Sequence, residues 1–247
     1  MRSITETVKH LIIINGLFFL ATLLYGDVMY GLFSLWFVEH PSFGFWQVIT
    51  HMFMHGGLSH IFFNMYALWA FGGALEHMWG GKKFLFFYLS AGIGAALIHT
   101  GVNYFYFYRG IQALEAGGYA AQQVITLLGQ GQFSPAWYDV ASQDTIQAMI
   151  EAISTPAVGA SGAIYGVLVA FGMAFPNSEL FLMFVPFPIK AKYFIPILIG
   201  LDLFSGITGY SIFGSGIAHF AHVGGALFGF LMAWYWKKNS FDRNRWY

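Results

Sequence analysis

Two short stretches decide the fold of this 247-residue chain: GASGAIYG at residues 159–166 and HVGGALFG at residues 222–229. Each stretch places two glycines four residues apart, so that both lie on one face of a helix. The pairs are Gly162 with Gly166 and Gly225 with Gly229. In a lipid environment, faces of small residues at this spacing let two helix backbones approach closely. We therefore predict that the two helices carrying these stretches pack against each other.

The same stretches carry candidate reactive side chains. His222 lies three residues before Gly225, on the face of small residues, so close packing would carry it towards Ser161. Tyr165 follows Ser161 by one helical turn, where its ring can stack on an imidazole. A hydroxyl beside a histidine is the usual pairing of a nucleophile with its base. The packing of the two helices is thus expected to bring a hydroxyl, an imidazole and an aromatic ring to one place.

Composition restricts the environment in which this packing occurs. Hydrophobic residues make up 57% of the chain and charged residues only 9%, whereas soluble domains have about 25% charged residues. A soluble enzyme and a disordered chain are therefore excluded. The net charge is zero without a basic tract, so a nucleic-acid partner is not expected. The absence of cysteine excludes thiolate catalysis, thiolate zinc sites and disulfides.

Six segments are apolar and long enough to cross a bilayer, which needs about 17 to 25 residues. They predict an all-α, six-transmembrane-helix bundle. The segments are about Lys9–Gly26, Leu58–Trp79, Lys83–Tyr108, Val158–Phe175, Tyr193–Tyr210 and Ile217–Trp236. We interpret the first as a span that is retained rather than as a cleaved signal peptide, because no small-residue cleavage site follows it.

The distribution of lysine and arginine predicts the orientation of the bundle. With six spans, ten of the eleven cations fall on the side of the termini, and only Arg109 lies on the other side. Cytoplasmic loops are enriched in Lys and Arg, so both termini are expected to be cytoplasmic. We predict a single membrane domain over residues 1–247, with an outer loop insertion at about 109–156. Short helices are expected there at about Tyr119–Leu128 and Asp144–Ile153.

A second outer segment, residues 27–57, is rich in aromatic residues. Amphipathic rings settle at the headgroup boundary of a bilayer, so we expect this loop to lie partly in the outer leaflet.

Polar residues also gather at one depth of the predicted bundle. His60 and Asn64 lie one turn apart on the second span, Ser161 begins the fourth, and His222 lies early in the sixth. Ionisable residues inside a membrane are rare and mark functional sites. These side chains are therefore expected to form one site in the outer third of the bilayer.

The motifs resemble those of the rhomboid family of intramembrane serine proteases, over about residues 40–235. GASG carries the serine and is followed by the tyrosine, and AHVGGALFG fits the pattern AHxxGxxxG. Upstream, HGGLSHIFFN fits HxxxxHxxxN, and Gly72, Glu76 and Gly80 fit GxxxExxxG. Trp46 stands where the Trp-Arg pair of the family begins, although Gln47 follows it here.

The resemblance implies a Ser-His dyad, with Ser161 as nucleophile and His222 as general base and acid. It implies that His60 and Asn64 stabilise the oxyanion with the Ser161 backbone N–H, and that Tyr165 orients the histidine. Substrates would be transmembrane segments of membrane proteins, reached through the lipid bilayer, with no cofactor and no metal. The expected location is the cytoplasmic membrane of a bacterium, with the site near the outer face.

Several further residues are assigned by the same argument. Because the family works with a dyad, Asp202 in the fifth span is a less favoured third member of the site. His219 and the pair His51 and His55 are expected to be structural. Glu76 and His77, at the inner end of the second span, are expected to cap and pack.

Two other classes of function stay open. A metal-binding transporter would use histidines as zinc ligands, and the candidates are His51, His55, His60, His219 and His222. A catalytically silent rhomboid-like protein would bind membrane proteins or act in their quality control. Relatives of that kind lose the serine or the histidine, whereas this chain has both.

Overall fold

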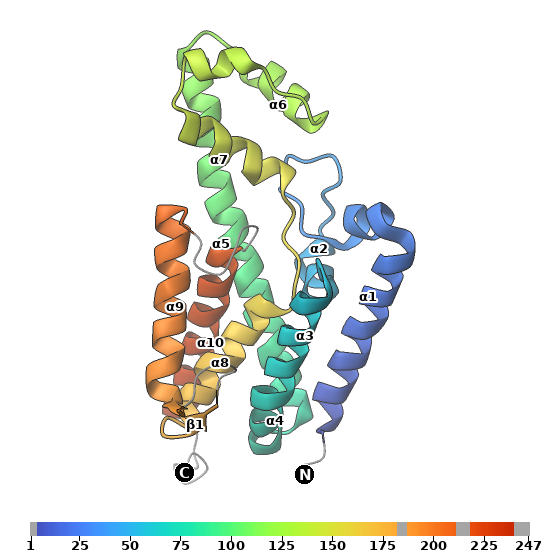
Figure 1. Ribbon diagram of the computed structural model, residues 1–247, viewed down its shortest axis with the longest axis vertical. Helices are drawn as coiled ribbons and strands as arrows, with labels where there is room; N and C mark the ends of the chain where they lie inside the picture. The colour runs from blue at the N-terminus through green and yellow to red at the C-terminus, as the bar shows by residue number, and fades with distance from the viewer. Residues whose placement is uncertain (1–3, 182–186, 211–217, 240–247) are drawn as a thin grey trace.

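The computed structural model describes residues 4–181, 187–210 and 218–239, about three quarters of them in helices (Figure 1). The helices before the candidate serine are α1 (Glu6–Phe33), α2 (Gln47–Thr50), the 3₁₀ helix η1 (His51–Phe53), α3 (Leu58–Ala67), the π-helical η2 (Leu68–Gly72), α4 (Gly73–Trp79), α5 (Gly81–Ala116), α6 (Ala121–Gly129), the 3₁₀ helix η3 (Pro135–Asp139) and α7 (Gln143–Ser154). After them come α8 (Ser161–Ala174), the antiparallel strands β1 (Glu179–Leu180) and β2 (Ile189–Lys190), α9 (Ala191–Thr208) and α10 (His219–Asn239).

Within the described residues, every predicted span coincides with a helix or a helical run. The predicted start of the sixth span at Ile217 lies outside the described residues. The second span is the continuous run of α3, η2 and α4, which contains one π-helical segment. Among the described residues, α1, α5 and α9 are long and apolar enough to cross a membrane, and α8 is a shorter apolar helix. The chain is thus a helical membrane protein, while the count of six spans and the cytoplasmic termini stay predictions.

The predicted contact between the two glycine faces is confirmed. A Cβ atom added at Gly225 would overlap the carbonyl oxygen of Gly162, and one at Gly229 would overlap the Cα of Gly166. Helix α5 covers the same seam, because a Cβ at Gly162 would lie 2.6 Å from the Cβ of Ala95. The backbones of α8 and α10 therefore touch directly, and α5 packs across both of them.

Helix α1 is attached at its first turn by a carboxylate from α4. Glu76 accepts hydrogen bonds from the backbone N–H groups of Thr7 and Val8, at 2.8 and 2.9 Å. The first N–H groups of a helix have no partner within the helix. A negative charge there also interacts favourably with the positive end of the helix dipole. The predicted capping role of Glu76 is confirmed.

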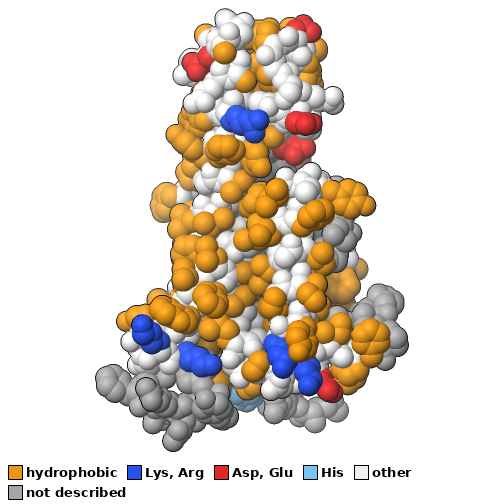
Figure 2. All heavy atoms as spheres, turned by 90° about the vertical axis from the view of Figure 1, so that its left-hand side faces the viewer, with side chains coloured by type: hydrophobic (Ala, Val, Ile, Leu, Met, Phe, Trp, Pro, Cys, Tyr) orange, Lys and Arg blue, Asp and Glu red, His pale blue; other side chains and the backbone are white. Residues whose placement is uncertain are grey.

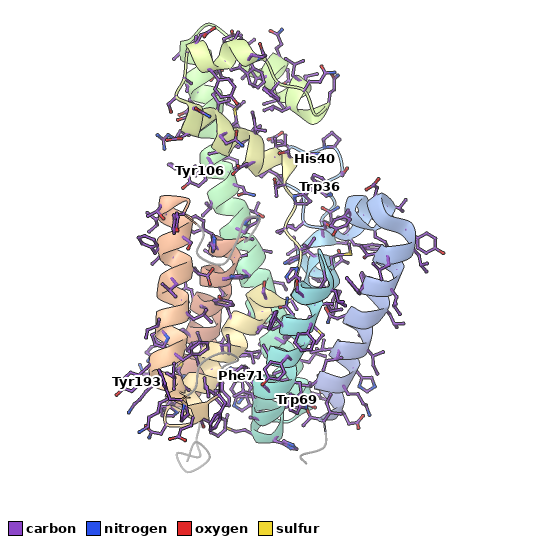
Figure 3. The ribbon with its side chains drawn as sticks, viewed as in Figure 1. Trp36, His40, Trp69, Phe71, Tyr106 and Tyr193 are labelled. Carbon is purple, nitrogen blue, oxygen red and sulfur yellow. The ribbon has the colours of Figure 1, made fainter. Side chains whose placement is uncertain are left out.

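The aromatic loop between α1 and α2 is organised by a buried glutamine. Gln47 donates to the backbone oxygens of Gly31 and Ser42, at 3.1 and 2.8 Å, and accepts from the N–H of Trp36. Trp36 in turn stacks on His40 with 3.9 Å between ring centroids (Figure 3). Gln47 thus connects distant parts of the loop at the position where the family motif has arginine.

Helix α5 extends beyond the predicted end of the third span. It continues from the expected end at Tyr108 to Ala116, because Phe107, Ile111 and Leu114 recur on one face and are buried. That face packs in a second hydrophobic cluster with residues of α6 and α7, which are the two short helices predicted there. The outer insertion therefore begins as a continuation of α5, and it projects from one end of the bundle (Figure 1).

The described lysines lie at the opposite end. They occur near the start of α1, at the starts of α5 and α9, and at the end of α10, and they are Lys9, Lys82, Lys83, Lys190, Lys192, Lys237 and Lys238. Figure 1 shows that all these helix ends lie together. Figure 2 shows blue side chains near this end of one face, below a broad band of exposed hydrophobic side chains. This arrangement agrees with the charge distribution from which the orientation was predicted.

The orientation can be tested with introduced cysteines, since the chain has none of its own. An impermeant thiol reagent added to intact cells should label Ser134→Cys, which lies in the outer insertion. It should label Lys82→Cys, at the other end of α5, only after the membrane is opened. Reaction at position 82 with protection at position 134 would invert the topology.

The direct contact of α8 and α10 at their glycines predicts that two glycine substitutions differ strongly in their effect on stability. Gly225→Ala should destabilise the protein by about 1–3 kcal/mol, the usual effect of inserting a methyl group into a packed core. Gly16→Ala on α1 is the control, because a Cβ there would have no neighbour within 4 Å in the part of the chain that the structure describes. Melting in detergent should show a lower Tm for the first variant alone. Equal Tm values would contradict the direct backbone contact.

Candidate active site

The close packing of α8 and α10 brings two reactive groups together. Ser161 is the first residue of α8, and His222 lies in the first turn of α10. The Nε2 atom of His222 lies 2.8 Å from the Ser161 hydroxyl oxygen, within hydrogen-bond distance. This is the geometry in which an imidazole can remove the proton of a hydroxyl nucleophile.

Tyr165 fixes the imidazole from one side. Its ring stacks on that of His222, with 4.3 Å between the centroids and 12° between the planes. The stacking that the one-turn spacing from Ser161 predicted is therefore present. The Tyr165 hydroxyl reaches further and donates a hydrogen bond to Oδ2 of Asp202.

Asp202, the less favoured candidate from the sequence, lies on the side of the His222 ring that faces away from Ser161. Its side chain is 1% exposed. Its Oδ1 atom is 3.2 Å from Nδ1 of His222 and 2.6 Å from Nδ1 of His219. The structure therefore brings a carboxylate from α9 to the imidazole nitrogen opposite Ser161. The signal in the sequence was a lone acidic residue inside an apolar span, which is rare without a functional reason.

His60 approaches Ser161 from α3. Its Nδ1 atom is 3.3 Å from the backbone N–H of Gly56 and accepts a hydrogen bond from it. With Nδ1 as acceptor, the proton of a neutral ring lies on Nε2. The inferred tautomer therefore makes Nε2 a hydrogen-bond donor.

A glycine keeps the space between His60 and Ser161 open. Gly159 has φ +121°, which other residues rarely adopt, and a Cβ there would lie 2.7 Å from His60 Nε2 and 3.5 Å from the Ser161 hydroxyl oxygen. Gly159 belongs to the GASG motif, but the sequence pattern assigned it no role. Asn64, one turn after His60, is buried and donates to the His60 carbonyl oxygen at 2.9 Å.

The start of α8 adds backbone donors to this space. The first N–H groups of a helix lack partners within the helix, and the positive end of the helix dipole favours an anion. Ser161 and Gly162 are the first two residues of this 14-residue helix. An oxygen that becomes negative beside Ser161 would therefore meet a favourable field.

The segment before Ser161 is held by backbone hydrogen bonds to the aromatic loop. Leu35 and Ala157 exchange two such bonds, each of 2.9 Å, and the Gly159 N–H donates to the carbonyl oxygen of His51. The side chain of His51 is buried and its Nδ1 lies 2.8 Å from the carbonyl oxygen of Gln47, while its predicted structural role stays a prediction. His55 is also buried, with its ring centroid 5.0 Å from that of His60.

An open cleft of about 3550 Å³ exposes the candidate site. Ser161, His222 and His60 line it, and so do apolar side chains from η2 and α9, among them Phe71 and Leu198. Figure 3 labels Phe71 on the side of η2 that faces α8, where its ring contacts Phe171. The cleft thus combines a polar centre with apolar flanks inside the hydrophobic bundle.

Histidines are frequent here, but they are not arranged as metal ligands. Among residues 4–181, 187–210 and 218–239, no group of three or more His, Cys, Asp or Glu side chains has the arrangement of a metal site. The short contacts of His222 are with Ser161, Asp202 and Tyr165. The described geometry therefore favours proton transfer over metal binding.

Comparisons with known proteins agree with the motifs. The sequence profile described as Rhomboid domain matches residues 42–239. The human presenilin-associated rhomboid-like protein, mitochondrial, is 30% identical over 189 residues, which cover 76% of this chain and 36% of that protein. Rhomboid protein 1, mitochondrial, of Saccharomyces cerevisiae is 26% identical, over 78% of this chain and 42% of its own length.

A bacterial relative matches the same extent of the chain. Rhomboid protease GluP of Bacillus subtilis is 28% identical over 76% of this chain and 25% of its own length. The chain therefore spans well under half the length of these curated relatives.

Proposed function

The chain belongs to the rhomboid family, and from that premise we propose that it is an intramembrane serine protease. It would hydrolyse a peptide bond in or near the transmembrane segment of a membrane-protein substrate. The observation that carries the proposal is the 2.8 Å contact between the Ser161 hydroxyl and His222 Nε2 in an open cleft.

In the proposed reaction, His222 takes the hydroxyl proton as Ser161 attacks the scissile carbonyl carbon. The tetrahedral intermediate collapses, the peptide C–N bond breaks, and His222 returns the proton to the leaving amine. Water then attacks the acyl-enzyme with His222 again as base, which releases the new carboxyl end and restores the serine. Tyr165 would keep the ring aligned through both steps.

The oxyanion of each intermediate would form in the space that Gly159 leaves open. His60 Nε2 faces that space. The free N–H groups at the start of α8 form the positive end of the helix dipole beside it. Asn64 would assist from the next turn of α3. Fixed donors in a site of low dielectric constant stabilise developing charge strongly.

Substrate would enter from the bilayer along the cleft between α9 and the run of η2 and α4. The apolar side chains that line this part of the cleft suit a hydrophobic segment of another protein. We propose a multi-pass membrane location with the site near the outer face. The relatives reported above include mitochondrial as well as bacterial proteins, so they give no support to the bacterial membrane predicted from the sequence.

A serine-directed fluorophosphonate probe tests the nucleophile. We expect detergent-solubilised protein to be labelled, and Ser161→Ala to lose both the label and the cleavage of a transmembrane substrate. Ser59→Ala is the matched control, because Ser59 also lines the cleft and should keep both signals. Cleavage should continue in the presence of a strong chelator.

Three results would overturn this proposal. A label that persists in Ser161→Ala would place the nucleophile elsewhere. A folded wild-type protein with neither label nor cleavage would favour a catalytically silent binding protein. Activity that a chelator removes and zinc restores would favour a metal-dependent function.

The oxyanion donors predict a graded effect on catalysis. His60→Ala and Asn64→Ala should each lower kcat by about 10²–10³ with little change in KM, because the oxyanion develops mainly in the transition state. The double variant should lose less than the product of the two single effects if both donors serve one oxygen. Turnover per probe-titrated site, with Tm measured in parallel, separates this result from simple unfolding. Wild-type kcat in both single variants would leave backbone N–H groups as the remaining donors.

A further inference from the structure

We propose that Asp202 is a positioning residue for the histidine, so that Ser161, His222 and Asp202 form a hydrogen-bonded row across α8, α10 and α9. This inference rests on the proposed protease function. It goes beyond that function because the resemblance implies a dyad, in which the tyrosine alone orients the ring.

The row is defined by the two nitrogens of one ring. Nε2 of His222 is 2.8 Å from the Ser161 hydroxyl oxygen, and Nδ1 is 3.2 Å from Oδ1 of Asp202. A carboxylate only accepts hydrogen bonds, and a neutral imidazole carries one N–H. Asp202 therefore selects the tautomer with the proton on Nδ1. That tautomer leaves the lone pair of Nε2 directed at the serine, as general-base catalysis requires.

The surroundings of Asp202 favour its charged form as an acceptor. A buried carboxylate is costly unless donors surround it. Tyr165 from α8 supplies its hydroxyl, and His219 and His222 from α10 supply ring nitrogens. Two of these donors, Tyr165 and His222, are themselves in stacking contact. The carboxylate is thus connected to the imidazole directly and also through the ring that packs on it.

A purely structural role for Asp202 is the competing interpretation. Its contact with His219 is shorter, 2.6 Å against 3.2 Å for His222. Asp202 would then hold α9 against α10 through His219, and its contact with His222 would have no effect on catalysis. The two interpretations predict different kinetics when each contact is removed separately.

The electrostatic surroundings of His222 make the pH profile informative. The described groups that face it are Ser161 and Tyr165 from α8, His60 from α3, His99 from α5, His219 from its own helix and Asp202 from α9. Asp202 is the carboxylate that the described residues place within hydrogen-bond distance of His222. A negative charge there favours the imidazolium that forms during the reaction. Removing it should extend activity to lower pH while reducing its maximum.

The decisive comparison uses Asp202→Asn, His219→Gln and Ser205→Ala. Ser205 lies three residues further along α9, is 1% exposed and has a hydroxyl without a hydrogen-bond partner among the described residues, so it controls for disturbance of this helix. We expect Asp202→Asn to lower kcat per probe-titrated site by about 10–10², a part of the usual contribution of acid–base catalysis. KM should change little, and the acid limb of the pH profile should move to lower pH. His219→Gln and Ser205→Ala should leave that limb in place.

The outcomes are separable. Equal effects of Asp202→Asn and His219→Gln on Tm and kcat, without a shift of the acid limb, would make Asp202 a structural tie between helices and overturn the inference. Wild-type kcat in Asp202→Asn would overturn it as well. Failure of the proposed function is recognised differently, because the wild-type chain itself would then show neither labelling nor cleavage.

Discussion

The direct backbone contact between α8 and α10 is the constraint on which the rest of the site depends. Gly162 and Gly225 leave no room for a side chain between the two helices, and Gly166 and Gly229 repeat the contact one turn further. With larger residues the helix axes would separate by several ångströms, and a 2.8 Å contact between side chains near their ends would be lost. The glycines thus set the distance between serine and histidine without touching either reacting atom.

Around this seam, the bundle supplies polar contacts among buried and partly buried side chains. Within lipid, each buried donor or acceptor needs a protein partner. The row from Ser161 through His222 to Asp202 meets that need with groups that are themselves reactive. The supporting contacts are more ordinary: Glu76 caps α1, and Gln47 connects the loop above the site. In most of the molecule, the side chains that stabilise the fold therefore take no part in the proposed chemistry. In this row, the same side chains serve both purposes.

Local patterns in the sequence were enough to predict the helices and the centre of the site. Glycine spacing predicts the seam, and the one-turn spacing of Ser161 and Tyr165 predicts the stacking on His222. The pattern does not reveal which way a side chain on a third helix turns, so the proximity of Asp202 needed the tertiary structure. Gly159 was missed as a site residue for a related reason, since its role depends on a backbone angle and on His60 from another helix. The end of α5 was misplaced because its last two turns are stabilised by α6 and α7 rather than by lipid.

The length of α5 would limit the space beside the cleft on the side of the insertion. A helix of 36 residues is about 54 Å long, whereas the hydrocarbon core of a bilayer is about 30 Å thick. Under the predicted orientation, the end of α5 that carries α6 and α7 would therefore extend beyond the lipid. Asp144 and Glu151 of α7 line the same cleft as the serine. Under the proposed function, a substrate that leaves the site on this side would pass beneath α6 and α7 as an extended chain. A bulky folded domain on that substrate would then need a linker long enough to extend past these helices.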